Sequence, residues 1–285
     1  MKFSSPEELI GESLSSGEYY KNPFPLFEEL RNQAPIHFSE TIGGWVLTRY
    51  REVDAVLRDH ENYSSKGRVT HLLSQLSDET QSKIQLLYAH FAIGLAHSDA
   101  PEHRRIRSLL AQSFTPKIID SLRPEISAQA QNLVANLEGE VDLIAELLTP
   151  LPALVVGKLL GSKPKDVPDL IRWAHAINGL YERGGKISEA KALHAEEMLR
   201  EMRDFVMDLV AECREQKVVG KLESVDVLSN LVLQEEESLS DQELLSTVVT
   251  LFVAGHETTT HLLGNGLFAL LQRPELIEEI DKVLK

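Results

Sequence analysis

Cysteine is almost absent from this sequence, since Cys213 is the only one among 285 residues. A single cysteine excludes an internal disulfide framework and is typical of a protein that folds in a reducing compartment. Long hydrophobic runs are also lacking. No segment approaches the roughly 18 apolar residues that a membrane-spanning helix needs, and residues 1–20 lack the apolar core of a signal peptide. We therefore expect a cytoplasmic protein without a membrane segment.

Positive charge is scarce as well. The chain has 29 Lys and Arg residues against 44 Asp and Glu residues, which gives a formal net charge of -15. Nucleic-acid binding depends on clustered basic side chains that neutralise phosphates, so this balance excludes a broad nucleic-acid-binding surface. Any basic docking surface must be local. The remaining composition is that of an ordinary globular chain, and we expect a single domain over residues 1–285.

Helical spacing of apolar residues dominates the chain. The one pattern with a period of two, in which residues 35–38 and 45–48 flank a turn ending in Gly43-Gly44, predicts a small hairpin. Residues 64–96 are expected to be irregular or only partly helical. Helices are predicted at residues 50–60, 99–114, 124–137, 142–160 (kinked or divided by Pro150 and Pro152), 166–181, 187–217, 224–233 and 240–273. The predicted fold class is mainly α with a small β hairpin region.

The last predicted helix contains a conflict with helix propensity. Ser240 and Glu243 form a capping box and Pro274 marks the far end, so the helix would be about 50 Å long and must cross the molecule. Its middle nevertheless reads Ala-Gly-His-Glu-Thr-Thr-Thr over residues 254–260. Glycine costs up to about 1 kcal/mol relative to alanine inside a helix. Such a conflict in a buried helix indicates a functional site.

The side chains of this segment permit two interpretations. Ala254, Gly255 and Thr258 are predicted to share a face, where the two small residues leave room for a flat ligand and the Thr258 hydroxyl can donate or accept a hydrogen bond. Glu257 beside them is a candidate proton donor. The alternative is a helix crossing built on small residues with an incidental glutamate. Spacing alone does not separate the two.

A second cluster opens the predicted helix at residues 99–114. Asp99 and Glu102 are interpreted as an acidic capping box, with Pro101 in the first turn. His103 and Arg107, four residues apart, lie along one edge of the predicted buried face. A histidine and an arginine at the boundary of a core are suited to bind the carboxylates of a largely apolar ligand. A solvated basic face of the helix is the alternative.

Both segments resemble signatures of one family. Residues 254–259 resemble the Ala/Gly-Gly-x-Asp/Glu-Thr-Thr signature of the oxygen-binding helix of cytochromes P-450. Residues 99–107 resemble the Asp-x-Pro-x-His-x-x-x-Arg helix of the soluble bacterial members. The resemblance implies the family's triangular prism and a haem b cofactor (iron protoporphyrin IX). It also implies that His103 and Arg107 bind the haem propionates and that Ala254 and Gly255 lie over the haem.

The resemblance further implies a function. The family's activity is monooxygenation, here the hydroxylation or epoxidation of a small organic substrate with O2 and two electrons. NAD(P)H would supply the electrons through a ferredoxin or flavodoxin-type redox partner, and Glu257 and Thr258 would guide protons. Arg104 and Arg105 are predicted to point away from the His103–Arg107 edge and to form a local basic spot for an acidic partner. A peroxide-driven relative is disfavoured, because those enzymes usually carry Arg where Glu257 stands.

Two later elements of the family do not occur in the sequence, namely the Glu-x-x-Arg helix and the Phe-x-x-Gly-x-x-x-Cys loop whose thiolate ligates iron. Cys213 lies in a charged amphipathic helix without glycines and is no substitute. We therefore expect the N-terminal two-thirds of the family domain without a metal ligand. The alternative is a truncated, haem-free helical protein without catalytic activity. Substrate determinants are expected in residues 64–96 and 174–191, with Gly184-Gly185 as the hinge of a substrate lid, and His97 is a candidate for contact with a haem edge.

Overall fold

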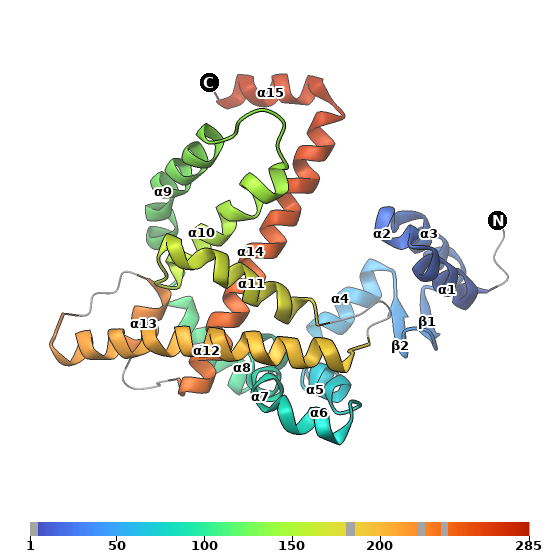
Figure 1. Cartoon of the computed structure of the whole chain (residues 1–285). Coiled ribbons are helices and arrows are strands. Elements are labelled where there is room, and N and C mark those ends of the chain that lie inside the picture. Colours follow the sequence, from blue (N-terminus) through green and yellow to red (C-terminus); the bar gives the residue numbers. More distant parts are fainter. Residues whose placement is uncertain (1–4, 181–185, 222–225, 235–238, 285) are drawn as a thin grey trace.

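The computed structural model describes residues 5–180, 186–221, 226–234 and 239–284. Helices dominate it, and the described part contains a single two-stranded sheet (Figure 1). The predicted fold class, mainly α with a small β hairpin, is confirmed. Within the described ranges, no helix combines the length and the apolar character needed to cross a membrane. The predicted hinge at Gly184-Gly185 lies outside these ranges.

Three helices that the sequence patterns did not predict precede the hairpin: α1 (Pro6–Ser16), α2 (Glu18–Lys21) and α3 (Phe24–Gln33). Ser5 caps α1 by accepting a hydrogen bond from the backbone N–H of Glu8. Helices α1 and α3 share a small hydrophobic cluster of Leu9, Ile10, Leu26 and Leu30, which is separate from the main core. Figure 1 shows this group set to one side of the long helices.

The predicted hairpin is confirmed. Strands β1 (Ile36–Ser39) and β2 (Gly44–Leu47) pair antiparallel, and Gly43 adopts the left-handed φ of 72° that glycine favours in a tight turn. The Glu7 carboxylate accepts hydrogen bonds from the backbone N–H and the hydroxyl of Thr41, which attaches the turn to α1. These two bonds lower the pKa of Glu7 to about 2.

Short helices make up most of the segment that was expected to be irregular or only partly helical. After α4 (Tyr50–Arg58), which confirms the helix predicted at residues 50–60, they are α5 (Arg68–Leu73), α6 (Asp78–Lys83) and α7 (Gln85–Ile93), followed by a 3-10 turn, η1 (Leu95–His97). The backbone then enters α8 (Glu102–Ala111). The predicted capping box of Asp99 and Glu102 is wrong, because Pro101 holds the N-cap position and no side chain caps the helix. Asp99 instead accepts hydrogen bonds from the backbone N–H of Ser65 and the hydroxyl of Ser64.

Prolines shape the next part of the chain, which comprises α9 (Pro116–Ala135), a π-helix η2 (Ile144–Leu148) and α10 (Pro150–Leu159). Helix α9 begins earlier than predicted, because Thr115 caps it and Pro124 is tolerated inside it. The predicted division at Pro150 is confirmed, since α10 begins there after the π-helix. Pro152 has no N–H to offer the carbonyl of Leu148 four residues earlier, so that carbonyl needs another donor.

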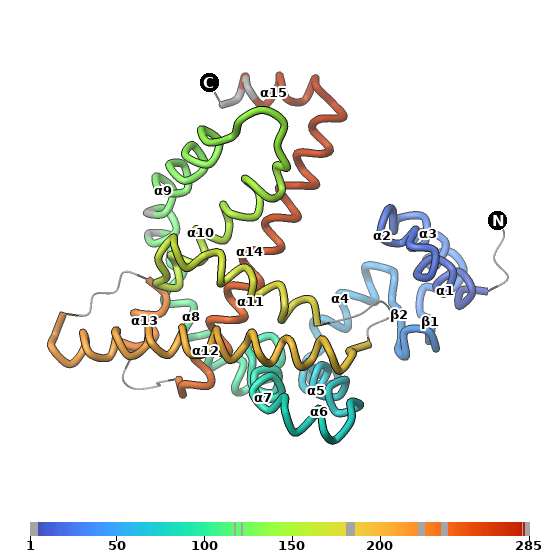
Figure 2. The backbone as a smooth tube through the Cα atoms, in the orientation of Figure 1, coloured from blue at the N-terminus to red at the C-terminus, as the bar shows by residue number. Residues whose placement is uncertain are grey.

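The chain continues with η3 (Pro164–Asp166), α11 (Val167–Asn178), α12 (Glu189–Val218), α13 (Val227–Leu233), α14 (Asp241–Leu271) and α15 (Pro274–Leu284). Of the described helices, α12 and α14 are the longest. The backbone trace in Figure 2 shows α14 running from the side of α8 and α12 to α15 at the far end of the molecule. The predicted capping box is confirmed at its start, where Ser240 accepts from the Glu243 N–H and Glu243 accepts from the Ser240 N–H. The N-terminal half of α14 is buried in the main core with α7, α10, α11 and α12.

Candidate functional site

The middle of α14 has a buried side and an open side. Phe252, His256 and Thr260 recur every four residues and are buried in the core. Ala254 and Thr258 lie on the opposite side of the helix and are exposed. Glu257 lies beside Thr258 and is half-buried. The structure therefore gives the predicted open face to Ala254 and Thr258, in a helix whose other side is packed.

Gly255 does not belong to that open face, and the predicted grouping of Ala254, Gly255 and Thr258 is wrong for this residue. A Cβ atom on Gly255 would lie 2.9 Å from a methyl carbon of Val156 on α10. The glycine thus lets α10 and α14 approach closely. For Gly255 the second interpretation, a helix crossing built on small residues, therefore holds, because this glycine faces α10. Ala254 faces outward.

The three consecutive threonines each donate a hydroxyl hydrogen bond to a carbonyl one turn earlier. The donor–acceptor distances are 2.6 Å from Thr258 to Ala254, 2.8 Å from Thr259 to Gly255 and 3.0 Å from Thr260 to His256. These bonds satisfy the hydroxyl protons within the helix. The Thr258 oxygen remains exposed and retains its capacity to accept.

Thr260 has a second role that sequence reasoning missed. Its buried hydroxyl also lies 3.1 Å from the carbonyl oxygen of Leu148, the group that Pro152 leaves without its usual helical donor. The single proton of this hydroxyl is therefore shared between the His256 and Leu148 carbonyls, and the shared bond compensates in part for a proline on another element. The signal was present in the sequence as Pro152, but nothing in the sequence pairs that residue with Thr260.

His256 is the most unusual buried group near the site. Only 1% of the residue is exposed, its ring stacks on Phe252 at 5.4 Å, and neither ring nitrogen has a hydrogen-bond partner among the described residues. Burial, followed by the nearby His175, lowers the pKa of His256 to about 4. The imidazole is therefore neutral at physiological pH and contributes to the core rather than to the open face.

The second predicted cluster lies on the wall of a cavity of about 560 Å³ between α4 and α8. Half-buried His103 and exposed Arg107 both line it, as do the exposed residues His60 and Tyr63, which sequence reasoning missed. Asp99 belongs to the same wall, and hydrogen bonds from Ser64 and Ser65 hold its pKa below the usual value. The structure thus brings His103 and Arg107 together at one concave surface.

The predicted basic spot at Arg104 and Arg105 is wrong. Arg105 forms a partly buried ion pair with Glu243, which fixes α8 to the first turn of α14. Arg104 does not point away from the His103–Arg107 edge, because it lines the same cavity. Local charge spacing could not reveal this, since Arg105 and Glu243 are 138 positions apart in the sequence.

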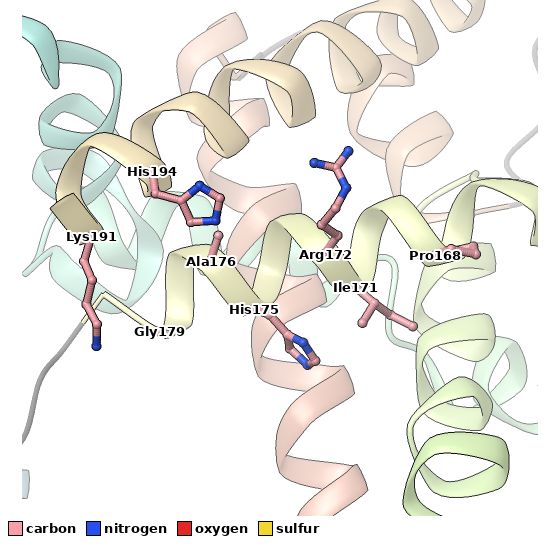
Figure 3. A pocket seen from close by; sticks show the side chains of 8 residues that line it. All are labelled: Pro168, Ile171, Arg172, His175, Ala176, Gly179, Lys191 and His194. Atoms are coloured by element: carbon pink, nitrogen blue, oxygen red, sulfur yellow. The ribbon is translucent and has the colours of Figure 1, made fainter.

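A further hollow of about 570 Å³ lies between α11 and α12, in the region where substrate determinants were expected. Figure 3 shows Arg172 extending toward α12, where its guanidinium contacts Glu201 at 2.7 Å. His175 points the other way, and its ring lies 5.6 Å from that of His256 on α14. The wall residue His175 therefore connects this hollow with the buried side of α14.

Two other residues considered in the sequence analysis, His97 and Cys213, do not line the His103–Arg107 cavity. The His97 ring packs against the edge of Phe91, and burial followed by the charge of Arg68 lowers its pKa. Contact between His97 and a haem edge stays a prediction. Cys213 is half-buried on α12, where burial followed by the charge of Asp226 raises the pKa of its thiol. A protonated thiol is a poor metal ligand.

Comparison with known proteins decides the family. The family model described as cytochrome P-450 matches residues 187–285, which contain α12, α13 and α14. Over 278 residues the chain is 31% identical to the polyketide biosynthesis cytochrome P-450 PksS of Bacillus subtilis, and this match covers 93% of the chain. This chain belongs to the cytochrome P-450 family. The chain spans 64% of the length of PksS.

Other P-450 relatives give the same answer. A vitamin D(3) 25-hydroxylase from Pseudonocardia autotrophica is 29% identical over 92% of this chain and 61% of its own length. Among solved structures, P-450 BioI in complex with an acyl carrier protein ligated to hexadec-9Z-enoic acid superposes with a TM-score of 0.78. It is 26% identical, over 94% of this chain and 66% of its own. The segment at residues 254–259 falls inside the family model's match.

Proposed function

We propose that this P-450 chain serves a haem-dependent monooxygenase that hydroxylates or epoxidises a small organic substrate with O2 and two electrons. The observation that carries the proposal is the open face of Ala254 and Thr258 in the middle of α14, directly opposite the buried residues Phe252, His256 and Thr260. Packing alone gives no reason for an exposed alanine and threonine there, with Glu257 beside them. Relatives named for hydroxylation and for polyketide biosynthesis support the reaction class.

The residues present fit a haem. His103 and Arg107 line a cavity with further polar groups from His60 and Tyr63, and this set of donors suits the carboxylates of the haem propionates. Ala254 presents only a methyl group and leaves room for a flat ring system. When bound, the haem b would supply the binding and reductive activation of O2. Gly255 supports this arrangement by letting α14 pack closely on α10.

Thr258 and Glu257 are proposed to handle protons on the open face. The Thr258 hydroxyl donates its proton to the Ala254 carbonyl, and its oxygen can still accept a hydrogen bond. Rotation about the Cβ–Oγ1 bond would redirect that proton to a group on the open face. The Glu257 carboxyl is half-buried beside it and can pass a proton from the outside. The packed side of α14, with Phe252 and His256, excludes water from behind.

The source of electrons is also part of the proposal. Reduced nicotinamide, NAD(P)H, would supply them through a ferredoxin or flavodoxin-type partner, and the support for this is the membership of the cytochrome P-450 family. A cytoplasmic location belongs to the same proposal, and its support is the presence of a single cysteine in the sequence. A single domain over residues 1–285 stays a prediction.

Haem titration of the chain tests the proposal. We expect added hemin to give a saturable absorbance change near the 400–450 nm region typical of haem proteins. Arg107→Ala and His103→Ala should each weaken binding about tenfold or more, because each removes a charge-assisted hydrogen bond. Arg123→Ala is the matched control, because Arg123 is an exposed arginine on α9. Absence of saturable binding would favour the haem-free helical alternative, and equal affinity in Arg107→Ala would return Arg107 to a solvated helix face.

A further inference from the structure

Helix α7 lacks a cap of its own. Its N-cap residue is Ile84, whose side chain cannot accept a hydrogen bond from the first turn. A carboxylate oxygen of Glu196, on α12, accepts the Leu87 N–H at 2.7 Å instead. Glu196 is only 3% exposed, and its negative charge lies where the unpaired N–H groups of a helix start favour an anion. Helix α12 therefore supplies the cap that the sequence of α7 omits.

A second carboxylate on α12 contacts the start of the preceding helix, α6, which Ser77 caps with its own side chain. Glu189 lies seven residues before Glu196, two turns along the same side of α12. Its carboxylate accepts the backbone N–H of Ser77, the N-cap residue of α6, at 3.1 Å. Arg200 balances the Glu196 charge through an ion pair at 2.5 Å that uses the other carboxylate oxygen. Carboxylates of α12 thus accept backbone N–H groups at the starts of two consecutive short helices, α6 and α7.

The other end of α7 is held by α14. A ring nitrogen of buried His90 lies 3.1 Å from the hydroxyl of Ser246, and that hydroxyl is also 3.1 Å from the His90 carbonyl oxygen. The chain then turns at Gly94, where a Cβ atom would come within 3.0 Å of the Ser246 hydroxyl. Beyond η1 it reaches Ser98 and Asp99, which line the His103–Arg107 cavity. Displacement of α7 would therefore displace one wall of that cavity.

We propose that Glu196 is a positioning residue that makes α7 follow α12 and thereby sets the position of the Ser98–Asp99 wall. The proposal rests on the proposed function only where it treats this cavity as the cofactor site. The competing interpretation is that Glu196 merely forms a stabilising ion pair with Arg200 within α12. The two interpretations differ in which partner of Glu196 matters, Leu87 or Arg200.

Hydrogen exchange of the 285-residue chain, followed by mass spectrometry, separates them. Glu196→Ala should accelerate exchange about tenfold in residues 85–99, because α7 loses a charge-assisted cap, while α9 and α10 keep their protection. Arg200→Ala removes the ion pair but leaves the carboxylate on Leu87, so exchange in residues 85–99 should stay within about twofold. Glu197→Ala, at the adjacent exposed carboxylate, is the control and should change nothing there. Glu196→Gln keeps an acceptor oxygen at the same reach and should restore most of the protection.

Other outcomes would overturn the inference. If Arg200→Ala accelerated exchange in α7 as much as Glu196→Ala, the ion pair would be the whole role of Glu196. If Glu196→Ala does not fold, Glu196→Gln and Arg200→Ala still decide, since the inference requires protected α7 amides in both. Hemin affinity is measured separately. It should fall at least threefold in Glu196→Ala, by loss of alignment in the cavity. An unchanged affinity with a loosened α7 would refute the link to the cavity, whereas absence of hemin binding in the wild type refutes only the proposed function.

Discussion

The two buried histidines on α7 and α14, His90 and His256, should make the chain lose stability as the pH falls below 6.5. Burial lowers the pKa of His90 to about 3 and that of His256 to about 4, whereas both titrate near 6.5 in an unfolded chain. The folded values lie below the unfolded ones, so the unfolded state binds more protons across this interval. The stability contributed by the neutral rings is therefore complete above pH 6.5 and declines as the pH falls through it.

The magnitude follows from the width of the interval. At pH 5 each ring is protonated in the unfolded chain and neutral in the folded one, which costs about 2 kcal/mol per histidine. Two such groups remove about 4 kcal/mol, a large share of the 5–15 kcal/mol that stabilises a typical domain. Glu7 also has a lowered pKa, but its contribution is lost only below its unfolded value of 4.5. The interval between pH 6.5 and pH 5 therefore isolates the histidines.

Urea unfolding followed by circular dichroism at pH 7 and pH 5 measures the effect. His256→Leu removes one of the two groups, so its loss of stability between these pH values should be about 2 kcal/mol smaller than that of the wild type. His71→Gln changes an exposed histidine on α5, which is not among the groups that shift the pKa of His256, and serves as the control. The reasoning is refuted if His256→Leu loses as much stability as the wild type between pH 7 and pH 5. In that case the His256 imidazole would accept its proton in the folded state as readily as in water.

Three further predictions concern the centre of α14. Thr260→Val should lower the free energy of unfolding by about 1 kcal/mol in the wild type and by clearly less in a Pro152→Ala background, because residue 152 then regains an N–H for the Leu148 carbonyl. Additive losses in a double-mutant cycle measured by denaturation would contradict this coupling. Gly255→Ala should destabilise the fold by about 1–3 kcal/mol through overpacking against α10, and adding Val156→Ala should restore much of that stability. An unchanged melting temperature in Gly255→Ala would show that α10 moves to accommodate the methyl group without a cost in stability. In a haem-loaded chimera of this chain with the C-terminal third of PksS, Thr258→Ala should fold and bind substrate but divert electrons from product to hydrogen peroxide. If the amount of product formed per reduced nicotinamide consumed is unchanged, the role of Thr258 is limited to its hydrogen bond within the helix.

Sequence reasoning succeeded where neighbouring residues decide the structure. The hairpin follows from a short alternating pattern around Gly43, and the start of α14 follows from Ser240 and Glu243, which cap each other across one turn. The recognition of both motifs had the same origin, because each is a short run of consecutive residues. Of the three residues predicted to share a face, Ala254 and Thr258 do lie on the same side of α14, whereas Gly255 faces α10.

The failures share a different origin, since each depends on a contact between distant segments. Asp99 looked like a helix cap, but Ser64 and Ser65 compete for its carboxylate from a loop about 35 residues away. Arg105 looked solvated until Glu243 was placed beside it. Local patterns specify which groups are available to pair, but they do not specify which distant partner lies beside them in the folded structure.

The segment at residues 254–260 in the centre of α14 provides both an open face and packing contacts with α10 and the π-helix. Successive residues on a helix point in directions about 100° apart, so a run of small and hydroxylated residues cannot face one ligand in its entirety. Thr258 faces outward, whereas Thr260 faces inward and satisfies the carbonyl that Pro152 leaves without a donor. Gly255, between them in direction, sets the distance to α10. Substituting Thr260 or Gly255 should therefore impair the open face indirectly, through the position of α14, while only Ala254, Glu257 and Thr258 act on it directly.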